Sequence, residues 1–192
     1  LKAKAKSLKA ETINGAGKIL CPGFVDLNMR VYDPGAEQKE NFATASASAA
    51  AGGFTSIACM PCTDPIHDNA FMTDFILRRA QEHSIVRAYP IGTITAGKEG
   101  KRLAEIGSMV QAGACAIADD NSTIMDTYLM RKAMEYVQAF AVPIFSYAED
   151  KNLFGLATMH EGLNSNRLGL RGVPAAAEEI IVARDLVLAR HT

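Results

Sequence analysis

The feature that most constrains the fold of this chain is a regular alternation of short apolar runs with longer helical stretches. The apolar runs fall at residues 19–28, 55–60, 86–92, 114–118 and 143–147. Each is continuous rather than interrupted at every second residue, which is typical of strands covered on both faces. The helical stretches lie at residues 41–51, 69–83, 100–112, 126–141 and 175–190. Strands that alternate with helices predict βαβ units and a parallel sheet.

The number of these units bears on the architecture. An eight-stranded β/α barrel typically needs about 250 residues, and this chain has 192. Five βα units therefore amount to a little over half of such a barrel, although an open doubly wound sheet fits the pattern equally well. A partial barrel would leave strand edges with unpaired backbone groups. Because the chain also starts at Leu1 rather than at Met, we expect further polypeptide or a partner to cover these edges.

Composition removes several classes of function. The net charge is −1, from 20 basic and 21 acidic residues, which gives no electrostatic case for binding nucleic acid or a membrane surface. No apolar run approaches the roughly 18 residues of a membrane span. The four cysteines lie in or beside apolar segments, so we predict buried, reduced thiols and a cytoplasmic location. The C-x-x-C pair at Cys59 and Cys62 has no second ligand pair and is interpreted as a coincidence.

Chemistry is expected at the end of the first apolar run, where the sequence reads FVDLNMRVYDPG over residues 24–35. Barrel enzymes present catalytic side chains at the C-terminal mouths of their strands. The segment resembles the first-strand signature of dihydroorotase, an amidohydrolase, which reads D-x-H-x-H-x-R-x-P-G. In this chain Asn28 and Arg30 occupy the two histidine positions, and Tyr32 occupies the arginine position.

Further segments that resemble the same family follow in the family's order, at residues 32–41, 49–55, 59–61, 118–120, 146–150, 167–172 and 176–184. The resemblance covers nearly the whole chain and decides between the two architectures. It implies a TIM-type (β/α)8 barrel of the metal-dependent hydrolase kind, with about the first five βα units present. Residues 1–20 would be a remnant of a small N-terminal β-subdomain, and residues 21–192 the partial barrel.

Members of the family interconvert carbamoyl-aspartate and dihydroorotate. This chemistry needs a divalent metal, usually zinc, held by neutral imidazoles and a carboxylate, to activate water and polarise the carbonyl. An arginine and an asparagine of the family grip the substrate carboxylate, the arginine through a bidentate fork.

The residues of this chain do not supply that set. Asn28 is a poor zinc ligand, and the permanent positive charge of Arg30 repels a cation. Tyr147 stands where another histidine ligand is expected and could coordinate only as a phenolate. Tyr32 replaces the substrate-binding arginine, and Cys62 replaces the asparagine. We therefore expect no catalytic residues, no metal and no other cofactor.

Asp119 and Asp120 are the ligand-type residues that remain. Two carboxylates without imidazoles favour a hard ion over zinc, if they bind one. They could equally form a solvated turn with Asn121, and the sequence does not decide which aspartate matches the family ligand. We hypothesise that Arg30 neutralises one of them across the former metal pocket. The four histidines, at positions 67, 83, 160 and 191, show no ligand-like spacing and are predicted to lie on the surface.

Three functions remain open. The favoured hypothesis is a catalytically inactive dihydroorotase homologue in pyrimidine biosynthesis. As such members of the family do, it would act as a structural partner of aspartate carbamoyltransferase, or of another subunit of the pathway, within an oligomer. The alternative is an active cyclic amidohydrolase, a dihydroorotase or a hydantoinase relative, with zinc or another metal on unusual ligands such as Asp119, Asp120 and Tyr147. In the third, Arg30 binds a small carboxylate that is not turned over.

Overall fold

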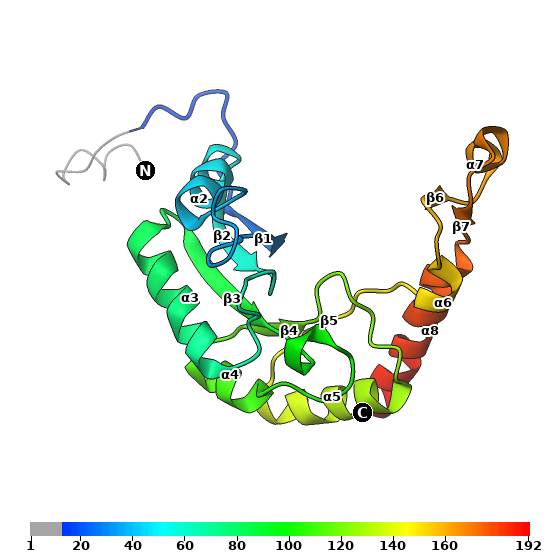
Figure 1. Ribbon diagram of the computed structural model, residues 1–192. Helices are drawn as coiled ribbons and strands as arrows, with labels where there is room; N and C mark the ends of the chain where they lie inside the picture. Colours follow the sequence, from blue (N-terminus) through cyan, green and yellow to red (C-terminus); the bar gives the residue numbers. More distant parts are fainter. Residues whose placement is uncertain (1–12) are drawn as a thin grey trace.

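The computed structural model describes residues 13–192, and its centre is a curled sheet of five parallel strands (Figure 1). The strands pair in chain order, β1-β2-β3-β4-β5. They are β1 (Phe24–Met29), β2 (Phe54–Cys59), β3 (Arg87–Gly92), β4 (Ala116–Ala118) and β5 (Ile144–Phe145). The predicted parallel sheet is thus confirmed, and its curl is that of a partial β/α barrel.

Helices connect successive strands and lie on the outer, convex side of the curl (Figure 1). They are α2 (Phe42–Ala51), α3 (Ala70–His83), α4 (Ile106–Ala112), α5 (Thr127–Val137) and, after β5, α8 (Ala176–His191). Short side chains satisfy the first backbone N–H groups of three of them: Asn41 caps α2, Asn69 caps α3 and Asp126 caps α5. Gly113 ends α4 with a φ of 115°, a left-handed conformation that favours glycine.

Apolar side chains fill both faces of the sheet. Between sheet and helices, one cluster gathers around Phe42, Ile57 and Ile76, and a second around Ile106, Met109 and Ile117. The alternate residues of the same strands form a third cluster on the other face: Ala58, Met60, Ile91, Ala116 and Ala118. Because strand residues alternate between faces, these mostly small side chains line the concave side and leave room for a pocket there.

The structure differs from the predicted elements in three places. Ile19 and Leu20, predicted as the start of β1, are almost fully exposed and outside any strand. The helix predicted from residue 100 begins only at Ile106, because Thr95 and Leu103 pair across the preceding loop. The segment after β5 contains four short elements that the sequence did not indicate: α6 (Lys151–Phe154), β6 (Met159–His160), α7 (Leu163–Leu168) and β7 (Gly172–Val173).

The proposed division at residue 20 stays a prediction. Residues 1–12 of the proposed β-subdomain remnant lie outside the described residues, and residues 13–20 contain one turn and no strand. The second sheet of the described residues is the two-stranded pair of β6 and β7, which lies after β5 in the chain and not in this segment.

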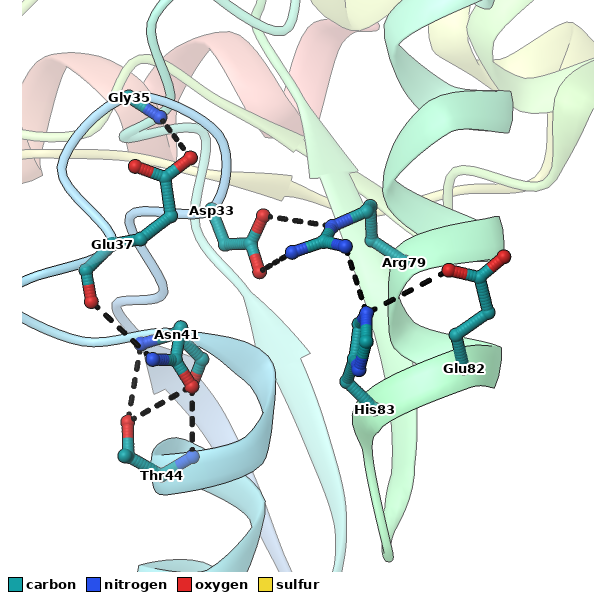
Figure 2. Close-up of polar contacts among 8 residues, drawn as sticks. All are labelled: Asp33, Gly35, Glu37, Asn41, Thr44, Arg79, Glu82 and His83. Carbon is teal, nitrogen blue, oxygen red and sulfur yellow. Dashed lines mark hydrogen bonds and ion pairs between the residues drawn. The ribbon is translucent and has the colours of Figure 1, made fainter.

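A buried ion pair fixes the loop between β1 and α2 (Figure 2). Asp33, 2% exposed, accepts hydrogen bonds of 3.1 Å from Nε and Nη2 of Arg79 on α3. The third guanidinium nitrogen, Nη1, lies 2.7 Å from Nε2 of His83, which itself lies 3.6 Å from a carboxylate oxygen of Glu82. The pair therefore ties the Tyr32–Gly35 loop to the outer helix layer.

Both ends of the curled sheet expose apolar side chains. Phe24, Val25 and Leu27 of the edge strand β1 are each more than half exposed. At the other end, α8 packs against α5 and α6 through Ala177 and Ile181, while a second apolar set remains in solvent: Ile180, Val182, Leu186 and Val187.

Candidate functional site

A pocket of about 370 Å³ opens on the concave face, at the C-terminal ends of the strands. Its apolar floor consists of Leu27, Met60, Ala118 and Phe145. Its polar lining consists of Asn28, Arg30, Asp119, Asp120, Ser146 and Tyr147. The parallel strands thus bring together, at one mouth, five of the site residues expected from sequence: Asn28, Arg30, Asp119, Asp120 and Tyr147.

An ion pair crosses this mouth from β1 to the loop after β4. Nε and Nη2 of Arg30 donate to the two carboxylate oxygens of Asp120 at 3.1 and 2.9 Å, and Nη2 also donates to Oδ1 of Asn121 at 2.8 Å. The Asp120 side chain is 4% exposed and that of Arg30 is 40% exposed. The hydrogen bond to Asp120 raises the pKa of Arg30, which therefore remains a cation. The hypothesis that Arg30 neutralises one aspartate is confirmed, and the aspartate is Asp120.

Asp119 is bound by a different part of the chain, the loop after β3. Its carboxylate is 2% exposed and accepts from the backbone N–H groups of Ile94 and Thr95, at 2.8 and 3.0 Å, and from the Thr95 hydroxyl. Burial raises the pKa of Asp119, and these donors oppose the rise. Asp119 therefore holds the loop after β3 against β4. Residues 119–122 do form a turn, in which the Ser122 N–H donates to the Asp119 carbonyl at 3.0 Å and Asn121 is exposed. The prediction that the two aspartates are solvated there is wrong, because both side chains are buried.

The remaining sequence-predicted positions surround the pair. Tyr147 is 38% exposed, and its hydroxyl donates to Glu149 at 3.3 Å. Burial is the main cause that raises its pKa, followed by the charge of Glu149, and a phenolate is disfavoured. Tyr32 and Cys62 do not line the pocket: Lys39 lies over the ring of Tyr32, and Sγ of Cys62 donates to the Val31 carbonyl.

The cysteines are free thiols, and their burial varies. Cys59 is buried, Cys62 and Cys115 are half-buried, and Cys21 is exposed, so the prediction of four buried thiols is wrong for Cys21. Burial raises the pKa of Cys59 to about 12 and also raises that of Cys62. A protonated thiol pair is a poor nucleophile and a poor metal ligand, which agrees with the interpretation of the C-x-x-C spacing as a coincidence.

These residues do not fit the divalent metal that the family resemblance implies. Asp120 is engaged by a guanidinium, and Asp119 by three donors on the neighbouring loop. Across residues 13–192, no three His, Cys, Asp or Glu side chains gather closely enough to bind a metal ion. The cationic Arg30 lies where a metal would need its ligands, so the donor set disfavours a second cation.

Comparison with known proteins identifies the family. The model of the family described as dihydro-orotase-like matches residues 17–192. The chain belongs to this dihydroorotase-like family. A protein named dihydroorotase from Solibacter usitatus is 48% identical over 97% of this chain and 43% of its own length. One from Geotalea daltonii is 42% identical over all of this chain and 46% of its own length. The chain thus spans less than half of these relatives.

A solved structure supports the fold alone. The L-hydantoinase (dihydropyrimidinase) from Arthrobacter aurescens superposes with a TM-score of 0.73 on 93% of this chain and 41% of its own chain, at 20% sequence identity. The prediction of a partial β/α barrel is confirmed by this match together with the sheet topology. Among the described residues, no helix is both long enough and apolar enough to cross a membrane.

Sequence reasoning missed two polar features, of which the first reaches the pocket through Ser146. Ser146 donates to Asp185 of α8 at 2.5 Å, and Arg184 holds the other oxygen of Asp185 while donating to the Ile124 carbonyl. His67, predicted on the surface, is fully buried, with Nε2 2.7 Å from the Thr73 hydroxyl. Burial lowers the pKa of His67 to about 4. The adjacent Arg184-Asp185 pair signals such a network, whereas nothing local to His67 indicates its burial.

Proposed function

We propose that this protein is a catalytically inactive member of the dihydroorotase-like family in pyrimidine biosynthesis. The single observation that carries the proposal is the fork between Arg30 and Asp120. A metal-dependent hydrolase must keep its carboxylate ligand free for the metal and must hold neutral donors around it. Here the carboxylate at the mouth is neutralised by a side chain of the protein itself.

Two further features support the same proposal. Tyr32, at the position where the family resemblance implies a substrate-binding arginine, lies against Lys39 and outside the pocket lining. Tyr147, at an expected histidine position, has a raised pKa, and its hydroxyl donates a hydrogen bond to Glu149. The changes therefore affect metal binding and substrate binding together, and one compensating ligand would not restore both.

We further propose a structural role as a partner of aspartate carbamoyltransferase, or of another subunit of that pathway, in an oligomer. The exposed apolar side chains at both ends of the sheet support a role in assembly, since apolar patches of this kind mark contact surfaces. A stable interface would bury on the order of 800 Å² on each partner. The remainder of a longer polypeptide could cover part of the same surface.

The test combines metal content, turnover and assembly. We expect less than a tenth of an equivalent of divalent metal in protein purified without chelator, and no turnover of dihydroorotate or carbamoyl-aspartate with added zinc. The dihydroorotase from Solibacter usitatus, assayed in parallel, is the positive control. Co-elution with aspartate carbamoyltransferase in size-exclusion chromatography is expected, whereas separate elution would contradict the structural role.

Turnover abolished by a chelator would support the alternative, an active hydrolase. In that case Arg30 would have to move away from Asp120 so that the carboxylate could bind the metal. The variants Asp119→Asn and Asp120→Asn would then each abolish the activity. Unchanged activity in both variants would trace the turnover to a contaminating enzyme.

A further inference from the structure

We propose that two copies of this chain pair through the exposed face of α8, as antiparallel helices related by a two-fold axis. The inference goes beyond the proposed function, which concerns a different protein as the partner. It rests on the order of the residues along α8 and on the exposure of their side chains.

The helix α8 buries one side and exposes the other. It is the last helix of the curl and packs against α5 and α6 (Figure 1). Its buried residues recur every four positions along one side: Ala177, Ile181 and Asp185. The opposite side carries four exposed residues, spaced by four, three and four positions: Glu179, Ala183, Leu186 and Arg190. This spacing places the four in one line along the helix, here called the α8 stripe.

The α8 stripe is self-complementary when one copy is reversed. Its charged residues stand at its two ends, Glu179 in the first turn of the helix and Arg190 in the last. A two-fold axis midway between residues 184 and 185 sets Glu179 of each copy opposite Arg190 of the other. The same axis sets the small Ala183 opposite the larger Leu186. A two-fold contact between identical chains requires a surface of this kind, whereas a contact with a different protein does not.

Charge selects the antiparallel arrangement. Parallel copies would place Glu179 beside Glu179 and Arg190 beside Arg190, and like charges repel. Antiparallel helices also bring opposite ends of their dipoles together. Within residues 13–192 neither side chain forms an ion pair, so both can meet a second copy. Exposed ion pairs add little affinity, and these two therefore fix the orientation of the helices more than the strength of the contact.

Apolar contact supplies the affinity. Leu186 is 64% exposed, and on either side of the α8 stripe Val182 is 42% and Val187 is 57% exposed. A hollow of about 430 Å³ lies along the C-terminal half of the helix, lined by Ala183, Leu186, Val187, Ala189 and Arg190. Under the two-fold axis this hollow faces residues 179–186 of the other copy, which include Val182 and Leu186. Because one helix from each copy makes the contact, we expect an interface below the standard size of about 800 Å² per partner, and a weak dimer.

The experiment is sedimentation velocity of the full chain at concentrations from about 1 to 200 µM, the range in which a micromolar dimer dissociates. We expect the mass of one chain at the lowest concentration and that of two chains at the highest. Circular dichroism of each variant checks that the helices are retained, so that loss of association is distinguished from loss of the fold.

Charge reversals locate the contact. Glu179→Arg or Arg190→Glu alone sets like charges opposite each other twice in every dimer, and should weaken association about tenfold. The double variant Glu179→Arg/Arg190→Glu restores both ion pairs and should recover association. An equimolar mixture of the two single variants should form mixed dimers for the same reason. The helix dipole cannot explain the recovery, because the double variant places both charges at the unfavourable ends of α8.

Two further variants separate the α8 stripe from its surroundings. Glu178→Arg is the matched control, because residue 178 carries the same charge in the same turn but lies about 100° around the helix from residue 179. This variant should associate as the parent does. Leu186→Ala removes apolar area from both copies and should weaken association about tenfold or more.

A parent chain that stays monomeric at the highest concentration would overturn the proposal, as would equal weakening by Glu178→Arg and Glu179→Arg. It would also be overturned if neither the double variant nor the mixture associated more strongly than the single variants. None of these outcomes bears on metal content, turnover or co-elution with the transferase, so failure here is distinguishable from failure of the proposed function.

Discussion

The chain contains two arginine–aspartate pairs of nearly the same geometry in two different regions. In each, Nε and Nη2 of the arginine grip both oxygens of a buried carboxylate, and the arginine is about one-third or more exposed. Arg79 joins Asp33 of a loop to α3 in the outer layer (Figure 2), whereas Arg30 joins β1 to the loop after β4 across the mouth. The same contact ties a loop to the outer helix layer in one region and engages a carboxylate beside a pocket in the other.

The comparison teaches that the contact alone does not define a site. Around Asp33 the third arginine nitrogen meets His83, so the guanidinium has a partner for each nitrogen. Around Asp120 the corresponding Nη1 faces no described acceptor, and a pocket lies beside it. Unused hydrogen-bonding capacity next to a cavity is what distinguishes the mouth.

The largest expected effect concerns His67, a buried titratable side chain that forms no ion pair among the described residues. Its folded pKa of about 4 lies below the unfolded value near 6.5, so the unfolded state binds a proton that the native state does not. Stability should therefore fall as pH drops from about 6.5 toward 4, by up to about 3 kcal/mol from this group. Urea denaturation of the parent and of His67→Gln at pH 7, 6 and 5 measures the loss.

The His67→Gln variant should lack that part of the pH dependence, since glutamine does not titrate. If stability falls with pH equally in the parent and in His67→Gln, the pKa of His67 is not lowered in the native state. That result would contradict the prediction.

The outer pair should give the next largest effect. Arg79→Ala leaves the carboxylate of Asp33, 2% exposed, without its cation, and should lower the free energy of unfolding by about 2 kcal/mol. Adding Asp33→Asn should restore part of the loss, because a neutral amide costs less to bury unpaired. A double-mutant cycle by urea denaturation measures the coupling, and a coupling near zero would contradict a structural role for the pair.

The mouth pair should have a smaller effect. Arg30→Ala should lower the free energy of unfolding by about 1 kcal/mol, because the Arg30 side chain is 40% exposed and solvent screens its charge. The same cycle with Asp120→Asn measures it. A loss greater than that of Arg79→Ala would reverse the comparison and would make the mouth pair the principal scaffold contact. The exposed pair of Lys132 and Glu135 is the control, and Lys132→Ala should leave the unfolding midpoint unchanged.

The smallest expected effect concerns metal. Addition of zinc or of a chelator should leave the melting temperature of the parent unchanged, because Arg30 already neutralises Asp120. Differential scanning fluorimetry measures the shift. A zinc-dependent rise that disappears in Asp120→Asn would place a metal at the mouth despite the ion pair.

The sequence by itself determined the parallel sheet, the order of its helices and the positions of the altered site residues. Continuous apolar runs and helical periods are local signals, and the motif around Asn28, Arg30 and Tyr32 lies in one short segment. It also suggested that Arg30 would meet an aspartate. The sequence did not predict β6 and β7, because a strand of two residues is too short to carry a periodic signal. Such strands form only when another segment of the chain pairs with them.

Only the tertiary structure decided which aspartate faces the mouth and which holds a loop. Asp119 and Asp120 are adjacent and chemically identical, both lie beyond the end of β4, and both line the pocket. In the folded chain Asp119 meets the backbone of the loop after β3, whereas Asp120 meets Arg30, 90 residues away along the chain. The burial of His67 was decided in the same way, because exposure depends on what packs around a side chain and not on the residues beside it in sequence.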